Sequence, residues 1–201
     1  MIESEFHNVI AGLDEAGRGP LAGPVSAAAV ILPPDFPKEI LNDSKKLSPK
    51  KRESAENLIK EKSLWALAFV DHKTIDEINI LQASLLAMKL AFEELLKKMP
   101  AWCEKTGIKL DKEMISAVVD GNFCPQIECS CRAEPKADGK YPEVMAASII
   151  AKCGRDRLML EYDRLYPQYG YKKHKGYPTL EHKKICCQLG PSPIQRLSFK
   201  Y

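Results

Sequence analysis

Four short apolar segments of the chain have the length and composition of buried β-strands. Each is bounded by glycine, proline or charged residues, which favour turns. The predicted strands cover residues 9–13, 25–32, 64–70 and 115–119. Because helical segments lie between several of them, the pattern is typical of an α/β fold.

Two longer segments contain apolar residues at the spacing of an amphipathic helix, and another, the first along the chain, is predicted to be a helix from its start signal. Ser48 followed by Pro49 marks the start of the first, and Thr74 with Glu77 forms a capping box at the start of the second. The predicted helices cover residues 49–62, 74–99 and 143–166.

The segments between and after these elements are less regular. Residues 97–113 are expected to form a surface excursion and residues 124–140 a loop. Residues 169–178 interleave tyrosines with lysines, a pattern suited to stacking on bases while neutralising phosphates. Thr179 is expected to cap a last helix that ends before Gly190.

Carboxylates follow the carboxyl ends of two predicted strands. Asp14 and Glu15 come after the strand at 9–13, and Asp120 comes after the strand at 115–119. Carboxyl ends of neighbouring strands are where sites on α/β sheets assemble. Adjacent carboxylates repel each other unless a cation lies between them, so this arrangement favours a divalent metal. Solvated loop charge and an ordinary Asp-Gly turn are the alternatives.

A further carboxylate, Asp156, lies in an apolar stripe of the helix predicted at 143–166. Steps of three or four residues place it on the face of Ile149, Cys153 and Leu160. A bare aspartate there is costly, so it must be paired or bind a cation. An ion pair with a core arginine is one interpretation, and a metal site shared with the other carboxylates is the one we favour.

Two polar loops are candidates for contact with phosphate. Gly17, Arg18 and Gly19 combine backbone amides that can approach an anion closely with a guanidinium that can bind it. Residues 42–46 precede the first helix and contain Asn42, Ser44, Lys45 and Lys46. These side chains suit a nucleic-acid backbone, although a solvated surface loop has the same composition.

Composition limits the class of protein. The chain has 201 residues, 45% hydrophobic and 28% charged, which fits one domain with an appendage. No apolar segment approaches membrane-spanning length, and the first residues do not resemble a signal peptide. We therefore expect a cytoplasmic protein that is not associated with a membrane. Its seven cysteines suggest reduced thiols, and the spacing of Cys124, Cys129 and Cys131 disfavours zinc.

The motifs occur in an order that resembles ribonuclease HII, the type 2 ribonuclease H. The first block, GLDEAGRGPLAGPV, is highly specific, and the later ones are weaker individually. The matching segments span residues 12–25, 43–47, 119–122, 146–152 with 155–156, and 176–179 with 182.

The resemblance implies a ribonuclease H-like α/β fold, with a mixed sheet flanked by helices and a helical C-terminal extension. The catalytic core would cover residues 1–165, and the substrate-binding extension and tail residues 166–201. The implied activity is cleavage of the RNA strand of RNA/DNA hybrids, and cleavage 5′ of ribonucleotides embedded in duplex DNA. Two Mn²⁺ or Mg²⁺ ions would act in catalysis, giving 5′-phosphate and 3′-hydroxyl ends. A monomer is expected.

The resemblance also assigns roles to residues. Asp14, Glu15, Asp120 and Asp156 would be the catalytic and metal-binding quartet. Gly17, Arg18 and Gly19 would contact the 2′-hydroxyl and phosphate at the cut, and Tyr177 would pack on the sugar at the RNA–DNA junction. The remaining expected substrate-binding residues are Ser44, Lys45, Lys46 and Lys136.

Two departures and two rival interpretations remain at this point. The family's usual Lys-Gly-Asp appears as Lys136-Ala137-Asp138, which makes the role of Lys136 less certain, and Cys153 replaces an aliphatic residue. Another two-metal nuclease of the same fold would cut branched DNA lacking ribose. A noncatalytic nucleic-acid-binding module would bind without turnover, but four carboxylates would repel phosphate unless metals intervene.

Overall fold

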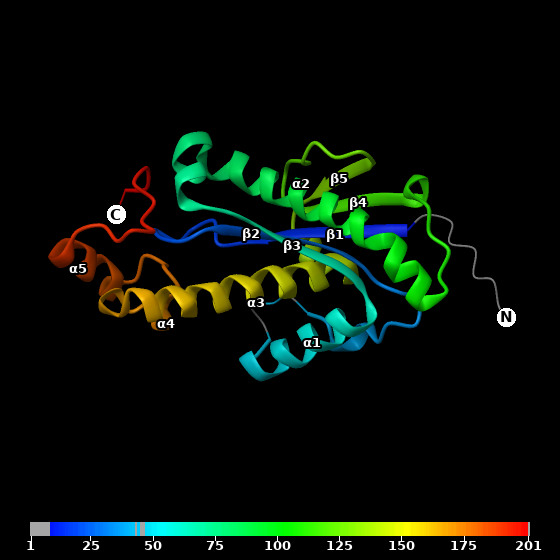
Figure 1. Ribbon diagram of the computed structural model, residues 1–201, viewed down its shortest axis with the longest axis horizontal. Helices are drawn as coiled ribbons and strands as arrows, with labels where there is room; N and C mark the ends of the chain where they lie inside the picture. Colours follow the sequence, from blue (N-terminus) through cyan, green and yellow to red (C-terminus); the bar gives the residue numbers. More distant parts are fainter. Residues whose placement is uncertain (1–8, 43, 45–46, 201) are drawn as a thin grey trace.

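The computed structural model describes residues 9–42, 44 and 47–200, and places a five-stranded mixed sheet between helices (Figure 1). The strands lie in the order β3-β2-β1-β4-β5. Their bounds are β1 Val9–Ala16, β2 Val25–Ile31, β3 Leu64–Val70, β4 Ile115–Asp120 and β5 Ser130–Glu134. The helices are α1 Pro49–Lys62, α2 His72–Thr106, α3 Pro142–Leu165, α4 Tyr171–His174 and α5 Leu180–Leu189. The expected mixed sheet flanked by helices is confirmed.

Strand pairing brings the acidic strand ends to one edge of the sheet. β1 is antiparallel to β2 but parallel to β4, with Leu13 opposite Val119. β4 is in turn parallel to β5, with Asp120 opposite Glu134. Because parallel strands end on the same side, the carboxyl ends of β1, β4 and β5 lie together.

Alternation along the strands divides the core between the two faces of the sheet. Ala11 and Leu13 of β1 belong to the apolar cluster that contains the buried residues of α2. Ala28 and Val30 of β2 belong to the cluster built with α1 and α3. Figure 1 shows α2 on one side of the sheet and α1 and α3 on the other. Since side chains alternate along a strand, Asp14 lies on the α3 side.

Most predicted elements are confirmed to within one residue, namely β2, β3, β4, α1, α3 and α5. β1 is longer than predicted, so Asp14 and Glu15 lie inside the strand rather than after it. Pairing with β2 continues to Ala16 opposite Ser26, which extends the strand through both carboxylates. The strand backbone therefore holds both acids.

The predicted start of α2 at a Thr74 capping box is wrong. Asp71 is the N-cap, and its carboxylate accepts a hydrogen bond from the Thr74 N–H at 2.8 Å. The helix is then interrupted at Asn79, whose φ is 69°. The Asn79 side chain accepts from the N–H groups of Leu81 and Gln82, so it caps the longer second part.

The predicted surface excursion at 97–113 is wrong in its first half, because α2 continues through Pro100 and ends at Thr106, with Gly107 as its C-cap. Met99, Trp102 and Cys103 pack against the apolar cluster beneath the helix. This burial stabilises a segment whose polar composition had indicated a loop.

The predicted loop at 124–140 contains the edge strand β5, which was missed. Its residues are exposed or half-buried and lack a clear apolar alternation. β5 forms by pairing with β4, from Ser130 opposite Ser116 to Glu134 opposite Asp120. An edge strand of this kind depends on its partner more than on its own sequence.

The interleaved segment at 169–178 is not an exposed aromatic strip. Tyr169 and Tyr171 are buried with Met159 and Ile194 in a separate cluster, and their rings stack at 5.9 Å. Among the tyrosines of this segment, only Tyr177 is exposed. The prediction was wrong because packing on the end of α3, not spacing in the sequence, determines which rings face solvent.

None of the helices in the described part of the chain is long and apolar enough to cross a lipid bilayer.

Candidate active site

Asp14 is the buried centre of the acidic site. It lies in β1 with 5% of its surface exposed, and one carboxylate oxygen accepts the N–H of Glu15 at 2.7 Å. The hydroxyl of Ser148, on α3, lies near this carboxylate and opposes the rise in its pKa. β1 and α3 therefore both contribute to the surroundings of Asp14.

Asp120 and Asp138 complete a group around Asp14. Asp120 ends β4, and its Oδ1 accepts the N–H of Ala137 at 2.8 Å. This bond holds the short 3₁₀ turn Ala137–Gly139, which carries Asp138. Carboxylate oxygens of Asp14, Asp120 and Asp138 lie within 4.8 Å of one another.

Crowding of these acids makes ionisation of the site unfavourable. Burial raises the pKa of Asp14 well above its usual value, and the neighbouring Glu15 and Asp120 charges raise it further. Burial also raises the pKa of Glu15; the Arg18 charge opposes this, and Asp120 adds to it. A divalent cation relieves such repulsion, because it removes the cost of placing several negative charges together.

The donor set fits a hard divalent cation. All side-chain donors of the cluster are carboxylate oxygens, which Mg²⁺ and Mn²⁺ prefer over the sulfur and imidazole ligands typical of zinc. The raised pKa of Asp14 points to the same need for positive charge.

Asp156 lies apart from that three-residue group. It is on α3, and its Oδ1 accepts a hydrogen bond from the Lys152 ammonium at 2.8 Å. Its side chain is 23% exposed, so it is half-buried rather than enclosed in an apolar stripe. The ion-pair partner is thus a lysine of the same helix instead of a core arginine, and the shared metal site stays a prediction. The structure brings Asp14, Glu15 and Asp120 together, adds Asp138, and pairs Asp156 with Lys152.

The Gly17-Arg18-Gly19 loop follows directly from β1. Gly17 has a φ of 97°, and a Cβ built on it would lie 2.1 Å from Nε of Arg155, so only glycine fits on both counts. The Arg18 side chain is half-exposed, with Nη1 3.4 Å from Oε1 of Glu15. The loop therefore presents an accessible guanidinium beside the acidic strand end.

Tyr177 lies against this loop. A Cβ built on Gly19 would be 3.9 Å from Cε1 of the ring, and the ammonium of Lys152 lies 5.6 Å from the ring centroid. The guanidinium of Arg155 is 5.9 Å from the same centroid. The tyrosine is 38% exposed, so one part of the ring is available to a ligand.

The remaining predicted substrate-binding residues are placed in part. Ser44 is buried and its hydroxyl lies 2.8 Å from that of Ser148. Either hydroxyl can be the donor in this bond. Lys136 is exposed and has a φ of 61°. Lys45 and Lys46 lie outside the described residues.

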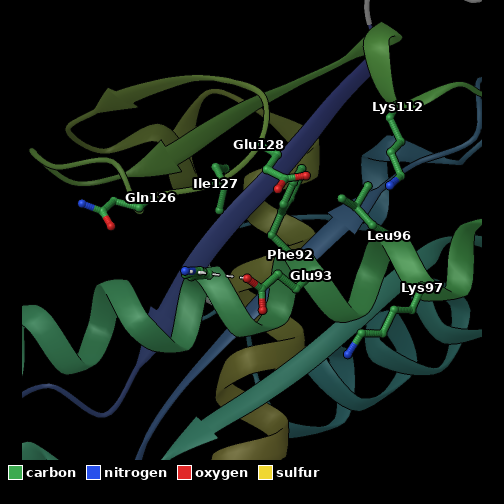
Figure 2. Close-up of a pocket in the computed structure, with 9 residues that line it drawn as sticks. Phe92, Glu93, Leu96, Lys97, Lys112, Gln126, Ile127 and Glu128 are labelled. Atoms are coloured by element: carbon green, nitrogen blue, oxygen red, sulfur yellow. Dashed lines mark ion pairs between the residues drawn. The ribbon is translucent and has the colours of Figure 1, made fainter.

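A hollow of about 380 Å³ lies elsewhere, between α2 and the segment that leads to β5 (Figure 2). Its lining residues are Lys89, Phe92, Glu93, Leu96, Lys97, Lys112, Gln126, Ile127 and Glu128. None of them is a predicted site residue. The acidic cluster instead lies at the strand ends, beside an exposed loop and tyrosine.

Comparison with known proteins identifies the family. The model of the family described as Ribonuclease HII matches residues 11–201. The chain belongs to the ribonuclease HII family. A Ribonuclease HII of Treponema denticola is 51% identical over 195 residues, which cover 95% of this chain and 98% of the relative. One of Dechloromonas aromatica is 47% identical over 192 residues, covering 95% and 90%.

A solved structure gives the same result for the fold. The crystal structure of ribonuclease H2 from Pyrococcus horikoshii superposes with a TM-score of 0.70 at 26% identity, covering 96% of this chain and 94% of that one. The ribonuclease H-like architecture expected from the motifs is therefore shown.

Family membership establishes the class of chemistry. The chain is a ribonuclease H hydrolase, and enzymes of the ribonuclease HII family act on RNA/DNA hybrids with divalent metal ions. The interpretation as a noncatalytic binding module is wrong, and a nuclease for branched DNA lacking ribose does not fit this family.

Two residues near the acids of this ribonuclease HII were not assigned by the sequence analysis. Asp138 lay in a predicted loop, and its Lys-Ala-Asp motif was the available clue. Alanine can replace the family's usual glycine at position 137, because the residue with the left-handed backbone is Lys136. Ser148 lay in the Ala-Ala-Ser-Ile-Ile motif, but only its position near Asp14 in the structure shows that it belongs to the site.

Proposed function

We propose that this ribonuclease HII cleaves the RNA strand of RNA/DNA hybrids and also cuts duplex DNA 5′ of single embedded ribonucleotides. It does so with two divalent ions, Mn²⁺ or Mg²⁺, and leaves 5′-phosphate and 3′-hydroxyl ends. We further propose that it acts as a monomer in the cytoplasm, with residues 1–165 as catalytic core and 166–201 as substrate-binding extension.

One observation supports this proposal most directly, namely a continuous line of contacts from the acids to Tyr177. Arg18 contacts Glu15 at 3.4 Å, and Gly19 lies beside the Tyr177 ring. Lys152 in turn contacts both that ring and Asp156. The acidic cluster is thus bordered by a group that binds a phosphate, a glycine that allows close approach to a ribose, and a ring that can stack on a sugar.

The acidic residues of the site have the role of holding the metal ions. The carboxylates of Asp14, Glu15, Asp120 and Asp156 hold the metal ions, and Asp138 is an additional ligand from the 3₁₀ turn. When bound, the ions supply water activation and neutralise charge on the phosphate and leaving oxygen. Ser148, which lies near Asp14, favours the ionised carboxylate that this role requires.

Binding of the substrate uses the residues around that cluster. Arg18 binds the phosphate at the cut, while the Gly17–Gly19 backbone contacts the 2′-hydroxyl. Ser44, Lys45, Lys46 and Lys136 contact the nucleic-acid backbone. Water adds to phosphorus as the bond to the 3′ oxygen breaks, so no side chain forms a covalent intermediate.

The deciding experiment is cleavage of a labelled DNA duplex that contains one ribonucleotide, in Mg²⁺, Mn²⁺ or EDTA. We expect metal-dependent cleavage on the 5′ side of the ribonucleotide and no cleavage of the matched all-DNA duplex. Ligation of the downstream product tests for the 5′-phosphate. Cleavage of long hybrids alone would disprove incision at single ribonucleotides but leave the family activity intact.

Tyr177 is expected to matter most at the RNA–DNA junction. Replacing Tyr177 with alanine removes the ring beside Gly19, and loss of one stacking contact should raise KM for the single-ribonucleotide duplex roughly tenfold. Tyr177→Phe keeps the ring and serves as control. Equal losses on junction and all-RNA strands would show that the ring does not select junctions.

A further inference from the structure

Arg196 is a fully buried arginine whose guanidinium hydrogen-bonds to the loop after β1. Its guanidinium donates to the carbonyl oxygens of Gly17 at 2.7 Å, Arg18 at 3.0 Å and Gly23 at 2.8 Å. All three acceptors lie in one stretch of seven residues, far from Arg196 in sequence. The C-terminal segment is thus hydrogen-bonded to the backbone of this loop.

Main-chain bonds hold the same two segments together. The Arg196 N–H donates to the Leu21 carbonyl at 2.8 Å, and the Gly23 N–H donates to the Ile194 carbonyl at 2.9 Å. The residues that follow are fixed to α2, because Asp76 accepts the N–H groups of Leu197 and Ser198. Arg196 is therefore held by a rigid frame, and its guanidinium has a fixed direction.

The hydrogen bonds from Arg196 determine which way the peptide groups of the loop face. In a trans peptide the N–H points opposite to the preceding carbonyl, and the described chain has no cis bonds. Because the carbonyls of Gly17 and Arg18 point at Arg196, the N–H groups of Arg18 and Gly19 point away from it. Neither N–H donates a hydrogen bond to any of the described residues, and Arg18 and Gly19 are both exposed.

Charge strengthens the arrangement. Burial lowers the pKa of Arg196 to about 9, so the guanidinium remains protonated at neutral pH. Hydrogen bonds from a charged donor are stronger than those between neutral groups. Lysine, with one ammonium, cannot reproduce the three-way fork.

We propose that Arg196 is a positioning residue for ribose recognition. By holding two carbonyl oxygens of the loop, it fixes the N–H groups of Arg18 and Gly19 toward the 2′-hydroxyl and adjacent phosphate of the substrate. This inference rests on the proposed function and adds to it a residue from the C-terminal segment, which acts through the loop and does not touch the substrate.

The test measures a preference, because a ratio does not depend on the folded fraction. In an Asp14→Asn background, which prevents cleavage, fluorescence anisotropy compares a duplex with one ribonucleotide and the same all-DNA duplex. We expect Arg196→Lys and Arg196→Gln to lower the preference for the ribonucleotide about tenfold, the effect of losing one or two well-formed hydrogen bonds, with all-DNA binding unchanged.

Arg157→Ala is the matched control, since it also removes an arginine that forms a two-fold hydrogen bond, here to Glu56 between α1 and α3. It should keep the preference. If both Arg196 variants keep it too, or lose affinity equally for both duplexes, the inference is wrong. An Asp14→Asn parent without any preference would instead overturn the proposed function, and the inference with it.

Discussion

Replacing Asp14 with asparagine is expected to abolish turnover while making the metal-free protein more stable. Turnover should fall at least about 10³-fold, because the buried centre of the proposed metal site loses its charge. Stability should rise by about 1–3 kcal/mol at neutral pH, since the folded state no longer encloses a carboxylate whose pKa is raised by burial and by Glu15 and Asp120.

The sign follows from the direction of the shift. A carboxyl with a raised pKa holds its proton longer in the folded state than in the unfolded one, so metal-free stability falls as pH rises above the unfolded value near 4. Asp14→Asn should flatten this decline. Thermal melts in EDTA between pH 4 and pH 8 measure it, alongside single-turnover cleavage.

Asp35→Asn is the control, because it removes one exposed aspartate outside the site. It should change neither activity nor the pH profile. Mn²⁺ alone should raise the melting temperature of the native protein and of this control, but much less that of Asp14→Asn, since a ligand stabilises only the state that binds it. An Asp14→Asn protein that cleaves normally would remove Asp14 from the catalytic site.

Gly17→Ala is expected to damage both stability and activity. The new Cβ would lie 2.1 Å from Nε and 2.4 Å from Cδ of Arg155, at a φ of 97°. Arg155 cannot retreat, because its guanidinium donates to the carbonyls of Pro24, Lys175 and Ala22. Strain and overpacking together should destabilise the protein by about 2–5 kcal/mol, which lowers the melting temperature by roughly 4–20 °C.

Activity should fall further than stability explains, by about 10²-fold in kcat/KM at a temperature where the variant is folded, because the loop beside Glu15 shifts. Gly107→Ala is the control: its φ is 72°, but no atom lies within 4 Å of the added Cβ. It should lose only about 1 kcal/mol and retain activity. Equal melting temperatures for the two variants would mean that Arg155 does move aside.

Local sequence was sufficient for several parts of this enzyme. Strand composition and turn residues located β2, β3 and β4, and the Ser48-Pro49 start located α1. The adjacent Asp14 and Glu15 could be singled out because an apolar strand precedes them and glycines follow. Each of these features depends on residues close together in the chain, so a linear pattern contains them.

Other features depended on partners distant in sequence. β5 exists because β4 offers an unpaired edge, and Asp138 reaches Asp14 because Asp120 binds the Ala137 N–H. Tyr171 looked like a surface ring but is buried beside Met159. No local pattern predicts such contacts.

The adjacent carboxylates, the glycine loop and most strands could thus be identified from the sequence, since their roles follow from residue type and immediate neighbours. The hydrogen-bond partners that orient these groups could not be identified in this way. The hydrogen bonds of the C-terminal Arg196 to the loop after β1 join residues that are far apart in the sequence. Such pairings are set by packing, because burial leaves each charged or polar group to find its hydrogen bonds among whatever the fold brings near.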